Sequence, residues 1–314
     1  MKRGTVVALA GGVGAARFLD GLARVVAPER LFIIGNTGDD AEIHGLHISP
    51  DLDTVAYTLA GLADRKRGWG LRGDSFHCLE ALGRLGGETW FQLGDRDLAT
   101  HLFHTERLRS GVRLDAITAE IAAALGVRAA LVPMSNDLVR SRICTPSGEL
   151  EFQRYFVERR ARDAVAGVRF EGAEQAAPAP GVVKAIASAE AIIVCPSNPF
   201  ISIGPILAVP GIREALRQKR ERVAAISPIV AGRALKGPAA AMMKSMKLRP
   251  AAAEVAKLYR DFAGVFVLDE MDRKQSAEVE SLEMRPVVTN TIMHGLRERK
   301  SLARAVARAM EIEP

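Results

Sequence analysis

The sequence lacks the features that mark several large classes of protein. Its 314 residues contain no apolar run near the ~20 residues that a membrane-spanning helix needs, so we expect no membrane partner. The three cysteines, Cys78, Cys144 and Cys195, lie far apart and form no CxxC pair. Scattered cysteines of this kind favour reduced thiols in the cytoplasm over a disulfide framework.

Aromatic residues are also scarce, at 5% of the chain. Aromatic side chains build the platforms on which single-stranded nucleic acids stack, so their scarcity weighs against such a partner. The net charge of +6 comes from scattered basic residues, and basic clusters such as Arg65–Arg67 are flanked by acids. We therefore expect no nucleic-acid partner, and we attribute the positive charge to an anionic small-molecule ligand.

Motifs for several kinds of catalysis are missing as well. The chain has no HExxH, no GxSxG and no Cys/His cluster at zinc-binding spacing. His44 and His47 lie three residues apart, but no partner at metal-ligand spacing accompanies them. We therefore predict no metal centre built on histidines.

The first 40 residues carry the clearest structural pattern. An apolar run at 5–10 predicts a buried strand, a glycine turn follows at 11–14, and apolar residues at helical spacing extend to residue 26. A second apolar run at 31–34 completes a strand–helix–strand unit. Further runs at 191–195, 222–226 and 265–268 predict more buried strands. The fold class is therefore α/β, a Rossmann-like, doubly wound and mostly parallel sheet.

Residues 55–175 have a different character. They mix amphipathic helical patterns with short strand candidates, and the segment 173–181 has the composition of a linker. We interpret 55–175 as an inserted cap of mixed helices and strands over the carboxyl edge of the sheet. Residues 1–54 and 176–314 then form the Rossmann-like core domain.

The glycine turn is the first candidate binding element. It consists of Gly11, Gly12, Val13 and Gly14, between the first predicted strand and helix. Backbone N–H groups at such a helix start can bind phosphate. The turn matches neither the dinucleotide fingerprint, whose third glycine would fall on Arg17, nor a P-loop. Phosphate binding and a tight turn of a kind found in any α/β protein both remain open.

Carboxylates gather after the second predicted strand. The segment 36–40 holds Asn36, Thr37, Asp39 and Asp40, and the segment 49–54 adds Asp51 and Asp53. Four carboxylates within fifteen residues, near a phosphate turn, fit Mg²⁺ held by carboxylates and a substrate phosphate. Capping of a turn and of a helix by Asn and Asp is the alternative.

Two further polar segments are candidates. Arg96 and Asp97 lie in GDRDLATH, where Arg96 either faces a phosphate or carboxylate of a ligand or belongs to a structural ion-pair cluster. Ser197, Asn198 and Ser202 lie in a proline-rich loop after the strand at 191–195. Such a rigid loop either presents its polar groups to a ligand or serves the structure alone.

Taken in order, these segments resemble the phospholactate transferases of coenzyme F-420 biosynthesis. The resemblance runs from residue 5 to about residue 295, through AGGVGAARFLDGL, NTGDD, SPDLDTVAYTLAG, GWGLRGDSF, WFQLGDRDLATH, PSNPFISIGPIL and LDEMDR. It implies a cytoplasmic, Mg²⁺-assisted, homodimeric transferase. Such an enzyme moves the phospho-acid group of 2-phospholactate, phosphoenolpyruvate or 3-phosphoglycerate from a guanosine diphosphate adduct to 7,8-didemethyl-8-hydroxy-5-deazariboflavin and releases GMP.

The resemblance also implies roles for the candidate residues. Asp39 would be a metal ligand with Asp40 beside it, and Arg96 would counter the developing charge. Asp51 and Asp53 would lie at the deazaflavin hydroxyl or support the metal. The remaining candidates would hold the nucleotide, the phosphates or the substrate: Gly11, Gly12, Val13, Gly14, Asn36, Thr37, Asp97, Ser197, Asn198 and Ser202. The chain departs from the family pattern at Asn136, where many members have Asp, and at Arg142, where smaller residues are usual.

Two other functions compete with the transferase. A related family of similar fold binds UDP-sugars without catalysis and regulates cell-wall metabolism, but it would not need SPDLDT or GDRDLATH. An NAD(P)-dependent oxidoreductase is disfavoured by the missing third glycine and by the paired acids after the second strand. The transferase therefore accounts for most of the unusual segments.

Overall fold

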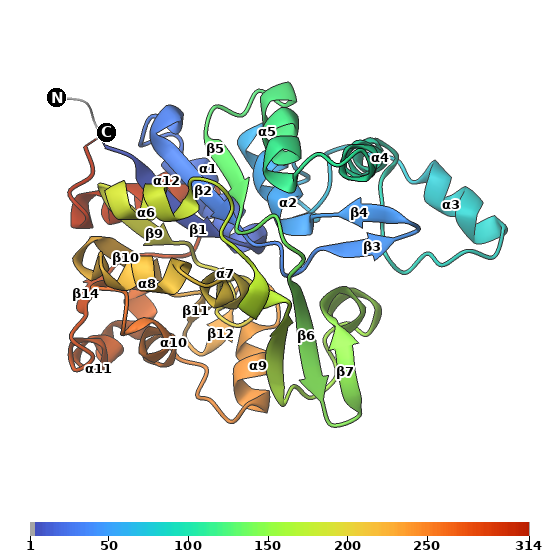
Figure 1. Ribbon diagram of the computed structural model, residues 1–314. Coiled ribbons are helices and arrows are strands. Elements are labelled where there is room, and N and C mark those ends of the chain that lie inside the picture. The colour runs from blue at the N-terminus through green and yellow to red at the C-terminus, as the bar shows by residue number, and fades with distance from the viewer. Residues whose placement is uncertain (1–3, 314) are drawn as a thin grey trace.

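A seven-stranded sheet organises the chain. The computed structural model describes residues 4–313, so residues 1–3 and 314 of the predicted core lie outside the description. All six pairings within the sheet are parallel, and the strand order is β14-β13-β10-β9-β1-β2-β5 (Figure 1). These strands are β1 (Val6–Ala10), β2 (Leu31–Gly35), β5 (Ala130–Pro133), β9 (Ala191–Val194), β10 (Val223–Ile226), β13 (Val265–Leu268) and β14 (Arg285–Val288). The predicted Rossmann-like, doubly wound sheet is confirmed.

The sheet separates two hydrophobic cores. Successive side chains of a strand point to opposite faces, so Val7 and Leu9 of β1 pack into one core while Val6, Ala8 and Ala10 pack into the other. The first core is covered by α6 (Val182–Ser188), α7 (Ile203–Ala208), α8 (Ile212–Arg217) and α10 (Ala252–Tyr259). The second is covered by α1 (Gly12–Leu22), α2 (Pro50–Leu59), α5 (Leu114–Ala124) and α12 (Leu296–Ala309). Burial on both faces explains why the strands are continuous apolar runs.

The predicted cap boundaries need correction. Residues 55–175 contain β5, which is the edge strand beside β2, and α5, whose Leu114 packs in the same core as Leu131 of β5. β5 and α5 therefore belong to the core domain and not to the cap. Because β5 is only four residues long and begins with an exposed alanine, its apolar signal is weak.

What remains of this region projects from the sheet in two parts. One comprises α3 (His77–Arg84), α4 (Asp95–Arg109) and the hairpin of β3 (Ala41–Ile43) and β4 (Leu46–Ile48), which comes from the predicted core (Figure 1). The other is a small antiparallel sheet of β6 (Arg140–Thr145), β7 (Gly148–Glu151) and β8 (Gly167–Glu171).

The other elements are short. They are β11 (Ile229–Val230), β12 (Arg233–Ala234), α9 (Ala239–Ser245), α11 (Ser276–Glu280), a π-helical turn (Arg154–Glu158) and 3₁₀ turns at Pro28–Arg30, Ala173–Gln175, Arg220–Arg222 and Glu270–Gln275. Within residues 4–313, no helix is both long and apolar enough to cross a bilayer.

The strand order reverses between β1 and β9, because β1 is followed outward by β2 and β9 by β10. Ligands of open α/β sheets bind at such a reversal, outside the carboxyl ends of the strands. The loops after β1, β2 and β9 carry the glycine turn, the segment 36–40 and the segment 195–202. The fold thus brings three of the predicted binding segments to one edge.

Candidate active site

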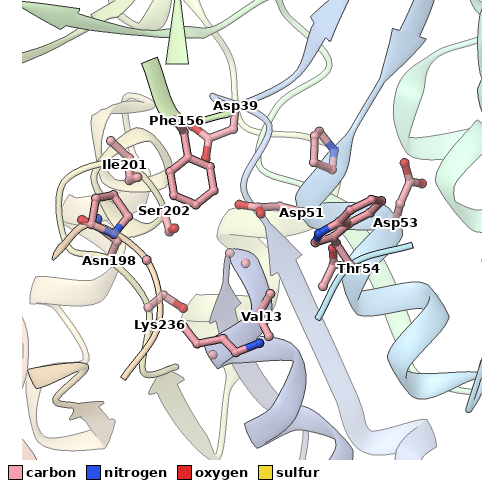
Figure 2. A pocket seen from close by; sticks show the side chains of 18 of the residues that line it. Val13, Asp39, Asp51, Asp53, Thr54, Phe156, Asn198, Ile201, Ser202 and Lys236 are labelled. Carbon is pink, nitrogen blue, oxygen red and sulfur yellow. The ribbon is translucent and has the colours of Figure 1, made fainter. Parts of the chain in front are cut away.

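A cavity of about 430 Å³ opens at this edge of the sheet. Figure 2 shows Asp39, Asp51, Asn198, Ser202 and Lys236 arranged around it. The lining includes these predicted residues: Gly11, Gly12, Val13, Gly14, Asp39, Asp51, Asp53, Asp97, Ser197, Asn198 and Ser202. Residues that are distant in sequence therefore form one site.

The glycine turn approaches its neighbours too closely for side chains. A Cβ on Gly14 would overlap the carbonyl oxygen of Pro196, and one on Gly11 would lie 2.7 Å from the Cβ of Ser202. Gly12 has a φ of +71°, which L-residues rarely adopt. α1 begins at Gly12 and has no side-chain cap. The Gly12 N–H donates to Asp51, and the N–H groups that follow it can bind an anion in the cavity.

Asp39 and Asp51 form a buried acidic pair in the cavity wall. Burial raises the pKa of Asp39 well above its usual value, and the charge of Asp51 adds to this rise. Burial raises the pKa of Asp51 to about 6, although a 2.8 Å hydrogen bond donated by Asn36 Nδ2 opposes the rise. Asp39 Oδ1 has no hydrogen-bond partner among the described residues. Burial and mutual repulsion thus disfavour ionisation of these two carboxyls unless a cation lies beside them.

Three predicted residues support the cavity wall from behind. Asn36 does not line the cavity; its amide donates to Asp51 and to the Ile201 carbonyl, and its oxygen accepts from Gly38 N–H. Asp40 also lies behind the lining, where Asp40 Oδ2 accepts from Ser49 Oγ at 2.8 Å. Thr37 is buried there too. Asn36 therefore positions the Asp51 carboxylate.

The loop after β9 contributes polar groups to the opposite wall. Ser197 is buried, and within the described structure its Oγ has no hydrogen-bond partner. Asn198 Oδ1 accepts from the Phe200 N–H at 2.9 Å, which fixes the Asn198 side chain. Ser202 lies against the glycine turn. The loop therefore has an unsatisfied hydroxyl at the cavity.

A second polar cluster joins α2 to α4. Asp53 Oδ2 lies 3.8 Å from His101 Nδ1, and His101 Nε2 lies 3.4 Å from Asp97 Oδ1. The Tyr57 hydroxyl donates to Asp97 Oδ1 at 2.7 Å. Burial raises the pKa of Asp53 to about 8, against the effect of His101. Sequence analysis missed Tyr57 and His101, although each lies four residues after a predicted aspartate, on the same helix face.

Arg96 does not lie in the cavity, contrary to the role expected of it. The side chain is exposed, and its guanidinium donates to the Arg72 carbonyl at 3.4 Å. The reason is helical geometry. Because α4 begins at Asp95, Arg96 is rotated about 100° from Asp97, which faces the cavity with His101.

Other cations line the cavity. Arg17, at the position of the missing third glycine, and Lys236 are two of them. Burial lowers the pKa of Lys236, and the charge of Arg17 lowers it further. Burial and the charge of Arg299 lower the pKa of Arg17. Arg67 stacks 4.6 Å above the ring of Phe76. These residues, and not Arg96, bring positive charge to the cavity.

An apolar wall completes the cavity. Its aromatic members are Tyr57 of α2 together with Trp69, Phe91, Phe152 and Phe156, which lie outside the central sheet and its covering helices. The rings of Phe152 and Phe156 stack in parallel, with centroids 5.4 Å apart. Sequence analysis missed this wall because its residues belong to separate segments that no periodicity connects. Such a wall suits a flat aromatic ligand.

The two departures from the family pattern lie outside the cavity. Asn136 Oδ1 accepts from the Asp115 N–H at 2.8 Å, in the first turn of α5. Arg142 pairs with Glu151 and Glu171 on the small antiparallel sheet. Neither substitution therefore changes the charge that lines the site.

Comparisons with known proteins agree with the geometry. A family model described as "2-phospho-L-lactate transferase CofD" matches residues 6–307. A protein named 2-phospho-L-lactate transferase from Methanosarcina mazei is 38% identical over 304 residues, or 97% of this chain and 100% of that protein. A protein named phosphoenolpyruvate transferase from Streptomyces griseus is 42% identical over 286 residues, or 89% of this chain and 90% of that protein.

Solved structures show the same fold. A member of the UPF0052 family from Bacillus halodurans superposes with a TM-score of 0.65 and covers 98% of this chain and 99% of that one. The two sequences are 16% identical, so this likeness supports the fold alone. It lends no support to the alternative of a UDP-sugar-binding regulator.

Proposed function

The chain belongs to the 2-phospho-L-lactate transferase CofD family, and on that premise we propose that it transfers a phospho-acid group in coenzyme F-420 biosynthesis. The donor is a guanosine diphosphate adduct of a three-carbon acid, the acceptor is 7,8-didemethyl-8-hydroxy-5-deazariboflavin, and GMP leaves. One observation carries the proposal. A single cavity combines a phosphate-binding helix start, buried carboxylates, cations and an aromatic wall.

Phosphoryl transfer depends on positioning and charge neutralisation more than on covalent participation of the protein. The N–H groups at the start of α1, together with Arg17 and Lys236, would hold the phosphates of the donor. The aromatic wall with Phe152 and Phe156 would hold the deazaflavin ring. We place Asp53 beside the attacking hydroxyl of the acceptor, because it lines the cavity close to this wall.

We propose Asp39 and Asp51 as the residues that hold Mg²⁺. Two buried carboxylates with raised pKa values, one with an unpartnered oxygen, fit a hard divalent cation. The bound cation would neutralise charge on the phosphates. Asn36 would keep the Asp51 carboxylate in place through its 2.8 Å hydrogen bond.

The resemblance also supports two statements about the whole protein. We propose that the chain forms a homodimer, which size-exclusion chromatography with light scattering would test. We propose the cytoplasm as its location, in keeping with its three free thiols, and fractionation of the source cells would test that.

A chromatographic assay of GMP release tests the reaction. GMP should form only when donor, acceptor and Mg²⁺ are all present, and EDTA should stop its release. GMP formation at the same rate without the acceptor would show hydrolysis of the donor and would contradict a transferase.

A further inference from the structure

The cluster between α2 and α4 contains three potential metal ligands that the proposed reaction does not use together. Asp53, His101 and His104 each offer one atom, and these atoms all lie within 4.8 Å of one another. All three residues are buried, with exposed fractions of 6%, 2% and 1%. His101 and His104 lie three positions apart on α4, which places them on one helix face. Sequence analysis overlooked this pair.

The potential ligand atoms lack partners. Within the described residues, Asp53 Oδ2, both ring nitrogens of His101 and Nδ1 of His104 make no hydrogen bond. Buried polar atoms are almost always hydrogen-bonded, so the unpartnered Nδ1 of His104, next to Asp53 and His101, indicates a missing ligand. From this geometry we propose that Asp53, His101 and His104 bind one divalent transition metal ion such as Zn²⁺ or Co²⁺, separate from the Mg²⁺ site.

The surroundings of His101 support this assignment. Its Nδ1 faces Asp53, while its Nε2 faces Asp97, whose carboxylate accepts from the Tyr57 hydroxyl. A metal-bound histidine commonly directs its second nitrogen to a carboxylate, which fixes the ring and its tautomer. Asp97 would serve that purpose here.

The chemistry of the ligands selects the kind of metal. Imidazole nitrogens suit Zn²⁺ and similar ions, whereas Mg²⁺ prefers oxygen ligands. Ligand atoms around one zinc ion lie roughly 3.3 Å apart, so small side-chain rotations would close the site.

The bound ion would connect two helices at the cavity. Asp53 belongs to α2 and the histidines belong to α4, so the metal would tie a helix of the core to a projecting helix. Asp53 and His101 also line the cavity, which gives the ion a path of entry and an open position. In Figure 2, Asp53 lies on the side of the cavity away from Asn198 and Ser202.

The test is titration of the full-length, chelator-treated protein with Co²⁺ by calorimetry and visible absorption, in excess Mg²⁺ so that the oxygen site is filled. We expect one Co²⁺ per chain, with absorption bands of nitrogen-ligated cobalt. Since loss of an outer-shell partner alone weakens binding by roughly 10–100-fold, His104→Ala should weaken it about 100-fold or more.

His77→Ala is the matched control, because it removes one histidine from a side chain that is 83% exposed. It should bind Co²⁺ like the wild type. Failure of the wild-type protein to bind one Co²⁺, or equal affinity in His104→Ala and the wild type, would overturn the proposal. Neither result depends on whether the chain is a transferase, because the readout is metal binding.

Discussion

At the scale of single residues, Asp39 is the most direct test of the cavity chemistry. Asp39→Asn keeps the shape of the side chain and removes its charge. Because electrostatic groups of this kind contribute about 10²–10³ in rate, we expect a loss of that order in kcat. The melting temperature should not fall, since burial disfavours the ionised carboxylate in the folded protein. Steady-state kinetics and calorimetry would check both statements.

The exposed Glu174→Gln provides the control for Asp39→Asn, because it removes a carboxylate charge outside the cavity lining. Near-normal turnover of a folded Asp39→Asn protein would remove Asp39 from the site.

The cations of the site give a second test at this scale. Lys236 lines the cavity, whereas Arg96 does not. Hydrogen bonds to charged groups contribute about 1.5–3 kcal/mol, so Lys236→Ala should raise KM for the donor at least tenfold. Arg96→Ala should change KM by less than about twofold, as surface charges contribute little. A larger effect of Arg96→Ala than of Lys236→Ala would restore the sequence-based role of Arg96.

His104 predicts a pH dependence of stability. Its pKa is about 3 in the folded protein, against a usual value of 6.5. Below pH 6.5 the unfolded chain therefore binds a proton that the folded protein does not, and stability falls as the pH falls towards 3. Between pH 7 and pH 5, the free energy of unfolding of His104→Gln should fall by about 2 kcal/mol less than that of the wild type. Urea unfolding in EDTA would measure this difference, and identical losses would contradict a buried, neutral His104.

At the scale of elements, the close approach of α1 to the loop after β9 shapes the site. Gly14→Ala would force its Cβ against the Pro196 carbonyl oxygen. Overpacking of this kind typically lowers the free energy of unfolding by about 1–3 kcal/mol, and denaturant unfolding would measure that loss. In Gly167→Ala no atom lies within 4 Å of the added Cβ. The free energy of unfolding of this variant should therefore stay within about 0.5 kcal/mol of the wild-type value. Equal stability of the two variants would mean that the turn tolerates a side chain.

Some elements were predictable and others were not. β1 and β9 have no exposed residues, so the sequence shows them as unbroken apolar runs. β5 has mixed exposure and four residues, which is too little periodicity to identify it. The face of α4 that carries Asp97 and His101 could have been found from their spacing, because residues four apart share a helix face. The sequence-based prediction included Asp97 but also Arg96, which lies on another face of α4, and it did not include His101.

At the scale of the whole molecule, the sequence predicted the sheet and the edge at which the cavity opens. It did so because strand ends in a parallel sheet meet at one edge, which brings Asp39, Asp51 and Ser197 together. It could not predict the aromatic wall, since Trp69 and Phe156 meet there only through tertiary packing. For the same reason, it did not show that α5 and β5 return to the core.

The transfer reaction itself is the central claim for the whole molecule. The direct measurement is mass spectrometry of the products formed by folded protein with Mg²⁺, the deazaflavin and, in turn, the guanosine diphosphate adducts of lactate, enolpyruvate and glycerate. We predict a phospho-acid deazaflavin and an equal amount of GMP with at least one donor, and the relative rates will identify the acid. Unmodified deazaflavin with all three donors would contradict the proposed function.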